Sequence, residues 1–396
     1  MANILILGGD GYLGWPTAMR FSQRGHSVTV VDNYLRRNAC VELDAGMLYP
    51  VPSLIERAKI WQEATGKTIK VVIADLSEPV AMRSLFNGSA TIRFPADTSC
   101  DTTPDCVVHY AEQPSAPFSL MSFDKADITI SNNLRVTNNL MWAVKDFAPS
   151  CHIIKLGTMG EYGTPNIDIE EGWLEVEHKG RSDKFLFPRQ AGSIYHTTKV
   201  MDTDLLWFGV RMWGLKVTDL MQGPVYGLET DEMQLDERLA TLFNYDEIFG
   251  TIVNRFIVRA VVNYPLTVYG KGGQTRGYLN IKDTLQCIEK SFESPADPGE
   301  LRIFNQIVET FSVNELAELI KNAGQSRGHD VTIQRMTNPR KEAEEHYYNP
   351  TYQGLQDIGL EPNFLTPKVL DGLFKTVEKH KNNIRTDVIF NGISWR

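Results

Sequence analysis

Short apolar runs alternate with amphipathic stretches along the first half of the chain. The apolar runs lie at residues 3–7, 27–31, 69–74, 105–110, 151–156 and 216–221. Between them, stretches with the helical spacing of apolar residues lie at 15–24, 53–65, 127–147 and 195–213. Strands that alternate with helices in this way are typical of an α/β fold with a doubly wound parallel sheet. We therefore predict a Rossmann-type sheet over residues 1–221.

The alternation becomes less regular after residue 221. The pattern there predicts one strand at 266–269 and helices at 249–262, 283–292, 312–322 and 367–380. We expect residues 222–396 to form a smaller, mixed α/β substrate domain, with a return segment near 275–295 that belongs to the first domain. Two polar stretches interrupt the pattern. We expect a surface loop at 89–104 and an irregular flap over the site at 164–190.

Three glycines follow the first predicted strand. Gly8, Gly11 and Gly14 let the backbone turn sharply, approach a pyrophosphate and bring the next helix close to the strand. The second strand ends in Asp32, whose carboxylate can accept hydrogen bonds from the adenosine ribose. Arg36 and Arg37 could instead accept a 2′-phosphate, but Asp32 would repel that group. The motif therefore favours NAD over NADP.

Further contacts with NAD are expected after the third predicted strand. The side chain of Asp75 and the backbone of Leu76 follow that strand and could reach the adenine. Asp75 could equally be a helix cap or a turn residue. The remaining residues that we predict to contact the cofactor are Tyr12, Leu13, Asn33, Tyr195 and Lys199.

Tyr195 and Lys199 lie four residues apart at the start of a predicted helix, so both side chains can point into one cleft. A nearby positive charge favours the phenolate, and the phenol could then exchange a proton with a sugar hydroxyl near neutral pH. Such a pair also occurs by chance on amphipathic helices. Thr158, at the end of the fifth strand, could hydrogen-bond the same substrate hydroxyl, or it could satisfy backbone groups at the strand end.

Composition and charge exclude several classes of protein. A net charge of -9 provides no basic surface for nucleic acid. No apolar run is long enough to cross a membrane, and no leader precedes the first strand, so we expect a cytoplasmic protein, or a plastid stromal one if the chain is a processed form. The five cysteines form no metal-ligand spacing, which predicts free buried thiols and no metal site.

The glycine turn, Asp32, Thr158 and the Tyr195–Lys199 pair, in this order, resemble the nucleotide-sugar branch of the extended short-chain dehydrogenase/reductase family. The resemblance implies catalytic roles for Thr158, Tyr195 and Lys199. It also implies that two arginines hold the nucleotide diphosphate, although either of them alone would be interpreted as a surface ion-pair partner. The residues that we expect to contact the substrate are Gln113, Thr158, Gln222, Arg276 and Arg340.

Within this branch, segments 156–172, 269–278 and 343–349 resemble members that attach sulfite to UDP-glucose. The resemblance implies a homodimer and a redox-neutral cycle with NAD, in which C4 is oxidised, the 6-hydroxyl is lost, sulfite adds at C6 and C4 is reduced again. Related 4,6-dehydratases carry Thr-Asp-Glu where this chain has Thr158-Met159-Gly160. Another group must then move the C5 proton, and His196 and Glu161 are the candidates. Either could instead be structural.

Three other functions remain as alternatives. A UDP-sugar 4-epimerase would use the same oxidation at C4. A 4,6-dehydratase is disfavoured by Met159-Gly160, which replaces the acidic pair. A regulator that senses NAD or nucleotides without turnover would use the fold alone, but it would have no need of the intact set of Thr158, Tyr195 and Lys199.

Overall fold

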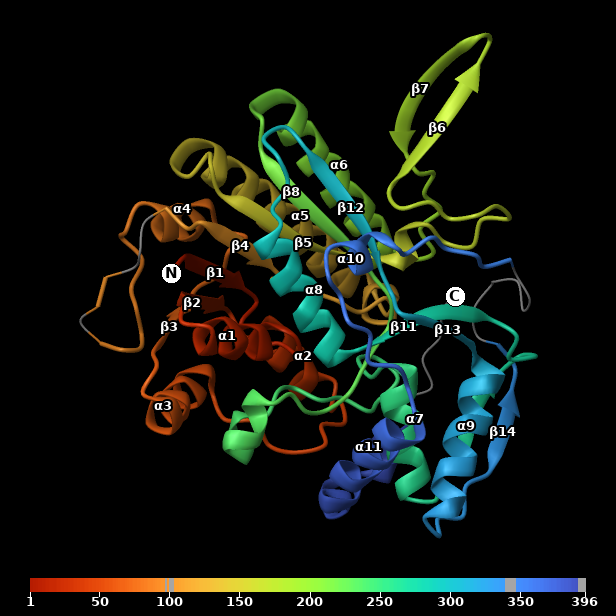
Figure 1. Cartoon of the computed structure of the whole chain (residues 1–396). Coiled ribbons are helices and arrows are strands. Elements are labelled where there is room, and N and C mark those ends of the chain that lie inside the picture. Colours follow the sequence, from red (N-terminus) through yellow and green to blue (C-terminus); the bar gives the residue numbers. More distant parts are fainter. Residues whose placement is uncertain (97, 100–102, 339–346, 391–396) are drawn as a thin grey trace.

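A computed structural model describes residues 1–96, 98–99, 103–338 and 347–390. Its centre is a seven-stranded sheet in the order β12-β8-β5-β4-β1-β2-β3, and every neighbouring pair is parallel (Figure 1). The strands are β1 (Asn3–Leu7), β2 (Ser27–Asp32), β3 (Ile69–Ile73), β4 (Cys106–His109), β5 (His152–Thr158), β8 (Lys216–Gln222) and β12 (Leu301–Gln306). The predicted doubly wound parallel sheet is confirmed.

Helices cover both faces of this sheet because its strands are apolar on both sides. On β1, Leu5 and Leu7 face one core and Ile4 and Ile6 face the other, as the two-residue period of a strand requires. The first core is covered by α4 (Pro79–Phe86), α5 (Phe123–Phe147) and α6 (Ile194–Trp213). The second is covered by α1 (Gly14–Gln23), α3 (Leu54–Thr65) and α8 (Ile281–Glu293), while α2 (Leu35–Glu42) follows β2.

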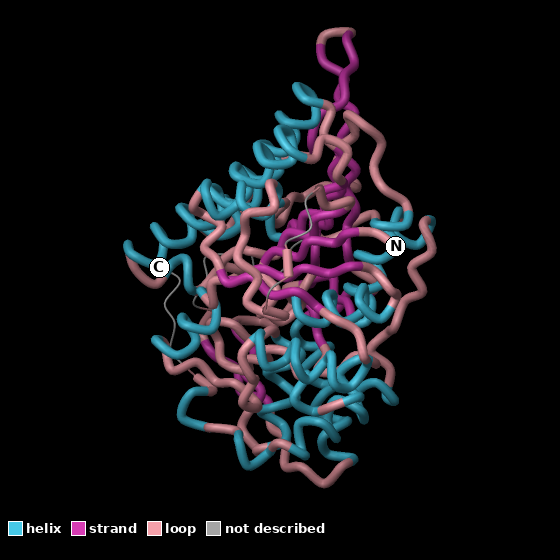
Figure 2. The backbone as a smooth tube through the Cα atoms, turned by 90° about the vertical axis from the view of Figure 1, so that its left-hand side faces the viewer, coloured by secondary structure: helices cyan, strands magenta, loops and turns pink. Residues whose placement is uncertain are grey.

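The C-terminal part surrounds a third core, which also takes in Leu48 and Tyr49. The helices of the C-terminal part are α7 (Ile252–Val261), α9 (Val313–Ser326), α10 (Gly354–Asp357) and α11 (Pro367–Lys379). Its strands form two small sheets, one of β10 (Leu266–Tyr269) and β14 (Ile333–Met336), the other of β9 (Val225–Tyr226), β11 (Thr275–Asn280) and β13 (Glu309–Ser312). Apart from α10, these helices and the two sheets lie together on one side of the large sheet (Figures 1 and 2).

Two expectations about secondary structure were wrong. Residues 164–190 are not wholly irregular, because β6 (Trp173–His178) and β7 (Arg181–Leu186) form an antiparallel hairpin that projects from the body of the protein (Figures 1 and 2). At its base, Trp173 packs edge-on against Trp207 of α6, with ring centroids 5.1 Å apart. The second error is a missed strand, because β12 adds a seventh strand to the large sheet beside β8.

The described part of the chain agrees with the expectation for the cysteines. Cys40, Cys106, Cys151 and Cys287 are buried and free, as predicted, while Cys100 lies outside the described residues. Among the described residues, no helix combines the length and apolar character that crossing a bilayer requires.

Candidate active site

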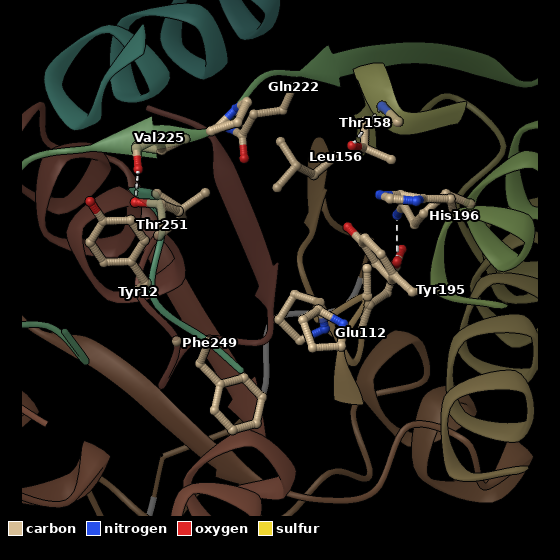
Figure 3. Close-up of a pocket in the computed structure, with 18 of the residues that line it drawn as sticks. Tyr12, Glu112, Leu156, Thr158, Tyr195, His196, Gln222, Val225, Phe249 and Thr251 are labelled. Atoms are coloured by element: carbon tan, nitrogen blue, oxygen red, sulfur yellow. Dashed lines mark hydrogen bonds and ion pairs between the residues drawn. The ribbon is translucent and has the colours of Figure 1, made fainter. Parts of the chain in front are cut away.

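A cavity of about 940 Å³ lies at the carboxyl ends of the central strands and extends to the C-terminal part. Thr158, Tyr195 and His196 lie together on one side of it, and Tyr12, Val225 and Thr251 lie on the other (Figure 3). Most of the residues predicted from the sequence line this cavity. They are Gly8, Gly11, Tyr12, Leu13, Gly14, Asp32, Asn33, Arg36, Leu76, Thr158, Tyr195, His196, Lys199, Gln222 and Arg276.

Four predicted residues do not line the cavity, and a fifth cannot be placed. Asp75 accepts a hydrogen bond from the amide of Ser77 at 2.9 Å, as expected of a turn residue. Gln113 is buried and donates to Thr129 at 2.9 Å, so it shapes the loop after β4. Arg37 and Glu161 are held in ion pairs with other side chains, as described below. Arg340 lies outside the described residues.

The glycine turn after β1 packs so closely against neighbouring backbone that side chains would not fit at two of its positions. A Cβ atom on Gly14 would lie 2.0 Å from the carbonyl oxygen of Gly8, so the start of α1 packs directly on the turn. Gly8 has a φ of +86°, and its Cβ would lie 2.6 Å from the carbonyl carbon of Tyr110. Only glycine fits either position. The turn therefore exposes backbone to the cavity at a helix N-terminus, which suits a pyrophosphate.

Asp32 closes the other end of the cofactor cradle. Its carboxylate accepts hydrogen bonds from the amides of Asp10 at 2.8 Å and Tyr34 at 2.7 Å, which fixes it at the strand end. Burial, followed by the charge of Asp10, raises the pKa of Asp32 to about 6. A carboxylate at this position can accept hydrogen bonds from the hydroxyls of the adenosine ribose.

The two arginines after β2 are already engaged. Arg37 pairs with Asp10 at 2.8 Å and does not line the cavity. Arg36 donates to Asn244 at 2.8 Å and lies over the ring of Phe249, 3.9 Å from its centroid. Neither arrangement resembles a prepared site for a 2′-phosphate, so the residues present fit NAD.

Tyr195 and Lys199 lie one turn apart at the start of α6. Ser193 caps this helix, since its hydroxyl accepts from the amide of His196 at 3.1 Å. The Lys199 ammonium contacts the carboxylate of Glu112, and Asp202 lies 3.8 Å from the same nitrogen. Burial by itself lowers the pKa of Lys199, but Glu112 and Asp202 outweigh it and the pKa is raised.

The expected lowering of the phenol pKa is wrong for the protein alone. Burial, followed by the charge of Glu112, raises the pKa of Tyr195 above its ordinary value. The main physical reason is burial of the phenol, which disfavours its charged form, and the Glu112 carboxylate beside Lys199 adds to the effect. Phenolate formation therefore needs further positive charge or a hydrogen-bond donor at this site.

Thr158 satisfies backbone groups at the strand end, which is one of the two roles considered from the sequence. It ends β5 at the cavity, and its hydroxyl accepts from the amide of Gly160 at 3.2 Å. Its own amide donates to Glu161 at 3.3 Å, which completes a capping box around the turn. The Thr158 side chain is thus held at a fixed place in the wall of the cavity.

Glu161 faces away from the cavity, and its position does not support the predicted catalytic contact. Its carboxylate is fully buried, 3.3 Å from the Lys155 ammonium and 3.6 Å from Arg189. Burial raises its pKa in spite of these cations. Thr203 and Asp219 complete this internal cluster. From there Glu161 holds the amide of Thr158, which lines the cavity.

His196 lines the cavity beside Thr158. Its Nδ1 lies 3.0 Å from the hydroxyl of Ser193. Its ring covers Gly160, where an added Cβ would lie 2.4 Å from Nε2. The small residue at position 160 therefore makes room for the imidazole in the wall of the cavity. His196 follows Tyr195 directly in the chain, and both side chains line the cavity because the first turn of α6 faces it.

Two residues of the site were missed by the sequence prediction. Glu112, three residues after the end of β4, contacts Lys199 across 87 positions of sequence. Its place after a central strand was a usable signal, because the carboxyl ends of such strands meet at the site. Ser193 was recognisable only as a helix cap. Among the described residues, no cluster of three potential metal ligands occurs.

Comparison with known proteins identifies the family. Residues 4–305 match the model of the NAD dependent epimerase/dehydratase family. The chain is 44% identical to the chloroplastic UDP-sulfoquinovose synthase of Spinacia oleracea, over all of this chain and 79% of that protein. It is 41% identical to the UDP-sulfoquinovose synthase of Sulfolobus acidocaldarius, over all of this chain and 98% of that protein.

Solved structures confirm the fold. UDP-glucose 4-epimerase from Bifidobacterium longum, in complex with NAD⁺ and UDP, matches 96% of this chain and 98% of its own, with a TM-score of 0.69 and 17% identity. UDP-glucuronic acid 4-epimerase from Bacillus cereus, with UDP-glucuronic acid and NAD, matches 95% and 99% with a TM-score of 0.68 and 17% identity. The chain therefore belongs to the NAD dependent epimerase/dehydratase family, in the branch that contains the UDP-sulfoquinovose synthases.

Proposed function

We propose that the protein converts UDP-glucose and sulfite to UDP-sulfoquinovose and water, with bound NAD. The observation that carries this proposal is the identity of 41–44% over the whole chain to two proteins named for that product. The turn Thr158-Met159-Gly160 supports it, because it provides a wall with an imidazole where related dehydratases carry an acidic pair.

The cradle for NAD consists of the glycine turn at Gly8 and Gly14 and the Asp32 carboxylate. NAD supplies the acceptor for a hydride from C4 of the sugar and returns the hydride at the end of the cycle. Along the wall between Asp32 and the catalytic group, the cavity offers Tyr12, Leu13 and Leu76 as apolar and backbone contacts.

The first chemical task is removal of the proton from the hydroxyl on C4. Tyr195 is the base, and Thr158 donates a hydrogen bond to the same oxygen. Lys199, one turn after Tyr195 on α6, supplies positive charge to the site, and Glu112 partly neutralises it. With the C4 carbinol oxidised to a ketone, the proton on C5 becomes acidic.

The second task is loss of water across C5 and C6. His196 takes the C5 proton and returns a proton to the departing 6-hydroxyl, which leaves an enone. Ser193 suits both halves of this exchange, because its hydroxyl can either donate to Nδ1 or accept from it. The sulfur of sulfite then forms a bond to C6, C5 regains a proton, and reduction at C4 completes the cycle.

The substrate nucleotide is assigned to the side of the cavity opposite β5. Arg276 lines that side from β11, and Gln222 lies at the end of β8, where it donates to Gln306 at 3.0 Å. Arg340 completes the proposed pair of diphosphate arginines. We further propose residues 1–221 with the return segment as the NAD-binding domain and residues 222–396 as the sugar-nucleotide domain, in a homodimer that acts in the cytoplasm or the plastid stroma.

The proposal is tested by incubating the protein with UDP-glucose, NAD and sulfite and following the sugar nucleotide by mass spectrometry. A sulfonated UDP-sugar is the expected product. Conversion to UDP-galactose without sulfonate would establish an epimerase. Accumulation of a 4-keto-6-deoxy sugar would establish a dehydratase, and tight binding without any product would favour a regulator.

A further inference from the structure

Glu112 is a buried carboxylate at the site to which the proposed reaction assigns no role. Its side chain is 5% exposed and contacts the Lys199 ammonium through Oε2. Its other oxygen, Oε1, lies 3.5 Å from Nε2 of His109 and has no hydrogen-bond partner within the described part of the chain. Burying a carboxylate in this way is costly unless it balances a charge.

Other titratable groups lie near Glu112 and Lys199. They are His109 on β4, Lys155 on β5, Glu161 in the turn after β5, Asp202 and His196 on α6, and Asp219 on β8. Lys155 is balanced by Glu161 and Asp219, which lie 3.3 Å and 3.1 Å away. His109 is neutral, because burial lowers its pKa to about 4.

Asp202 is the more distant of the two carboxylates near Lys199. It lies 3.8 Å from the Lys199 nitrogen, and burial, followed by the charge of Glu112, raises its pKa well above the ordinary value. Glu112 contacts the ammonium directly and is therefore the main partner of Lys199. Because it lies in the cavity wall near Tyr195, its charge also acts on the phenol (Figure 3).

We propose that Glu112 is a positioning residue that holds the Lys199 ammonium and sets the pH range in which Tyr195 gives up its proton. The carboxylate holds the lysine in the wall of the cavity and opposes early loss of the Tyr195 phenol proton. Exchange of the proton is thereby coupled to binding of substrate and cofactor. This inference deepens the proposed function and rests on its first step, the oxidation at C4.

The test uses Glu112→Gln, which keeps the shape of the side chain and removes its charge, with Glu112→Asp as the matched control that retains the charge. NADH absorbance is followed in a single turnover of UDP-glucose without sulfite, across a range of pH. We expect the pH of half-maximal oxidation to fall by about one to two units in Glu112→Gln, as removal of one nearby charge predicts. Glu112→Asp should stay near the wild-type midpoint.

A second measurement does not depend on turnover. The tyrosinate absorbance of each protein is titrated and corrected with its Tyr195→Phe counterpart, and the Tyr195 phenol should ionise at lower pH in Glu112→Gln than in the wild type. Unchanged midpoints in both measurements, with equal loss of rate in the two variants, would reduce Glu112 to a structural residue. Absence of sulfonate product in the wild type would refute the proposed function but leave both readouts intact.

Discussion

Replacing Gly160 with alanine tests whether His196 must occupy its place in the cavity wall. An added Cβ would lie 2.4 Å from Nε2, 2.5 Å from Cδ2 and 3.0 Å from Cε1 of the imidazole. Ordinary contact begins near 3.4 Å, so the ring would have to move by about 1 Å. The backbone of Gly160 is not in the left-handed region, so alanine itself is tolerated there.

A displacement of about 1 Å of a proton-transferring group costs roughly 100-fold in rate, or about 2.7 kcal/mol of activation free energy. We expect this loss in the formation of sulfonate, because His196 acts at C5 and C6. Oxidation at C4 should remain within about threefold of wild type, since Tyr195 and Thr158 keep their supports. NADH would then accumulate without formation of the sulfonated product, which would show that the reaction stops after oxidation at C4.

The assay compares two rates in the same protein. NADH absorbance reports oxidation at C4, and mass spectrometry reports the sulfonated product. Gly372→Ala is the control, because Gly372 is exposed on α11 with nothing within 4 Å of an added Cβ. Normal sulfonate formation by Gly160→Ala, or an equal loss in both rates, would refute the assignment of His196 to the second half of the reaction.

Three further predictions concern single residues. Tyr195→Phe should abolish oxidation at C4 and leave the affinity for UDP-glucose within about threefold in calorimetry; substantial turnover would remove Tyr195 from the mechanism. The affinity for NAD should weaken as pH falls through 6, by about tenfold at pH 5, because Asp32 has a pKa of about 6 and its charged form accepts from the ribose; a flat profile between pH 5 and pH 7 would contradict this. Glu161→Gln should lower the free energy of unfolding by about 3 kcal/mol in urea titrations, because Lys155 loses a buried partner; unchanged stability with lost turnover would indicate a direct chemical role instead.

The large sheet could be predicted because its strands are apolar on both faces and the helices between them have a clear period. The hairpin at β6 and β7 could not, because its residues are mostly exposed and polar and lack a buried face. Strand β12 was missed because it pairs with β8 across some eighty residues, beyond the reach of a local pattern. Whether such a segment forms a strand depends on its pairing with distant residues, and the local spacing of apolar residues does not show that pairing.

The site was predictable where chemistry depends on local spacing. The glycine turn, Asp32 and the Tyr195–Lys199 pair are all local, and each lines the cavity. The orientation of Glu161 and the contact of Glu112 with Lys199 depend on which groups are buried together. The expected ionisation of Tyr195 was wrong because spacing on a helix shows neither the burial of the phenol nor the carboxylate that pairs with Lys199.

The central claim is a redox-neutral cycle in which the hydride removed from C4 returns to C4 of a sulfonated sugar. UDP-glucose deuterated at C4 and supplied with sulfite tests it most directly, with the product examined by mass spectrometry and NMR. The account predicts UDP-sulfoquinovose that retains deuterium at C4, without net formation of NADH. A sulfonated product that has lost the label, or retention of the label only in unsulfonated sugars, would contradict it.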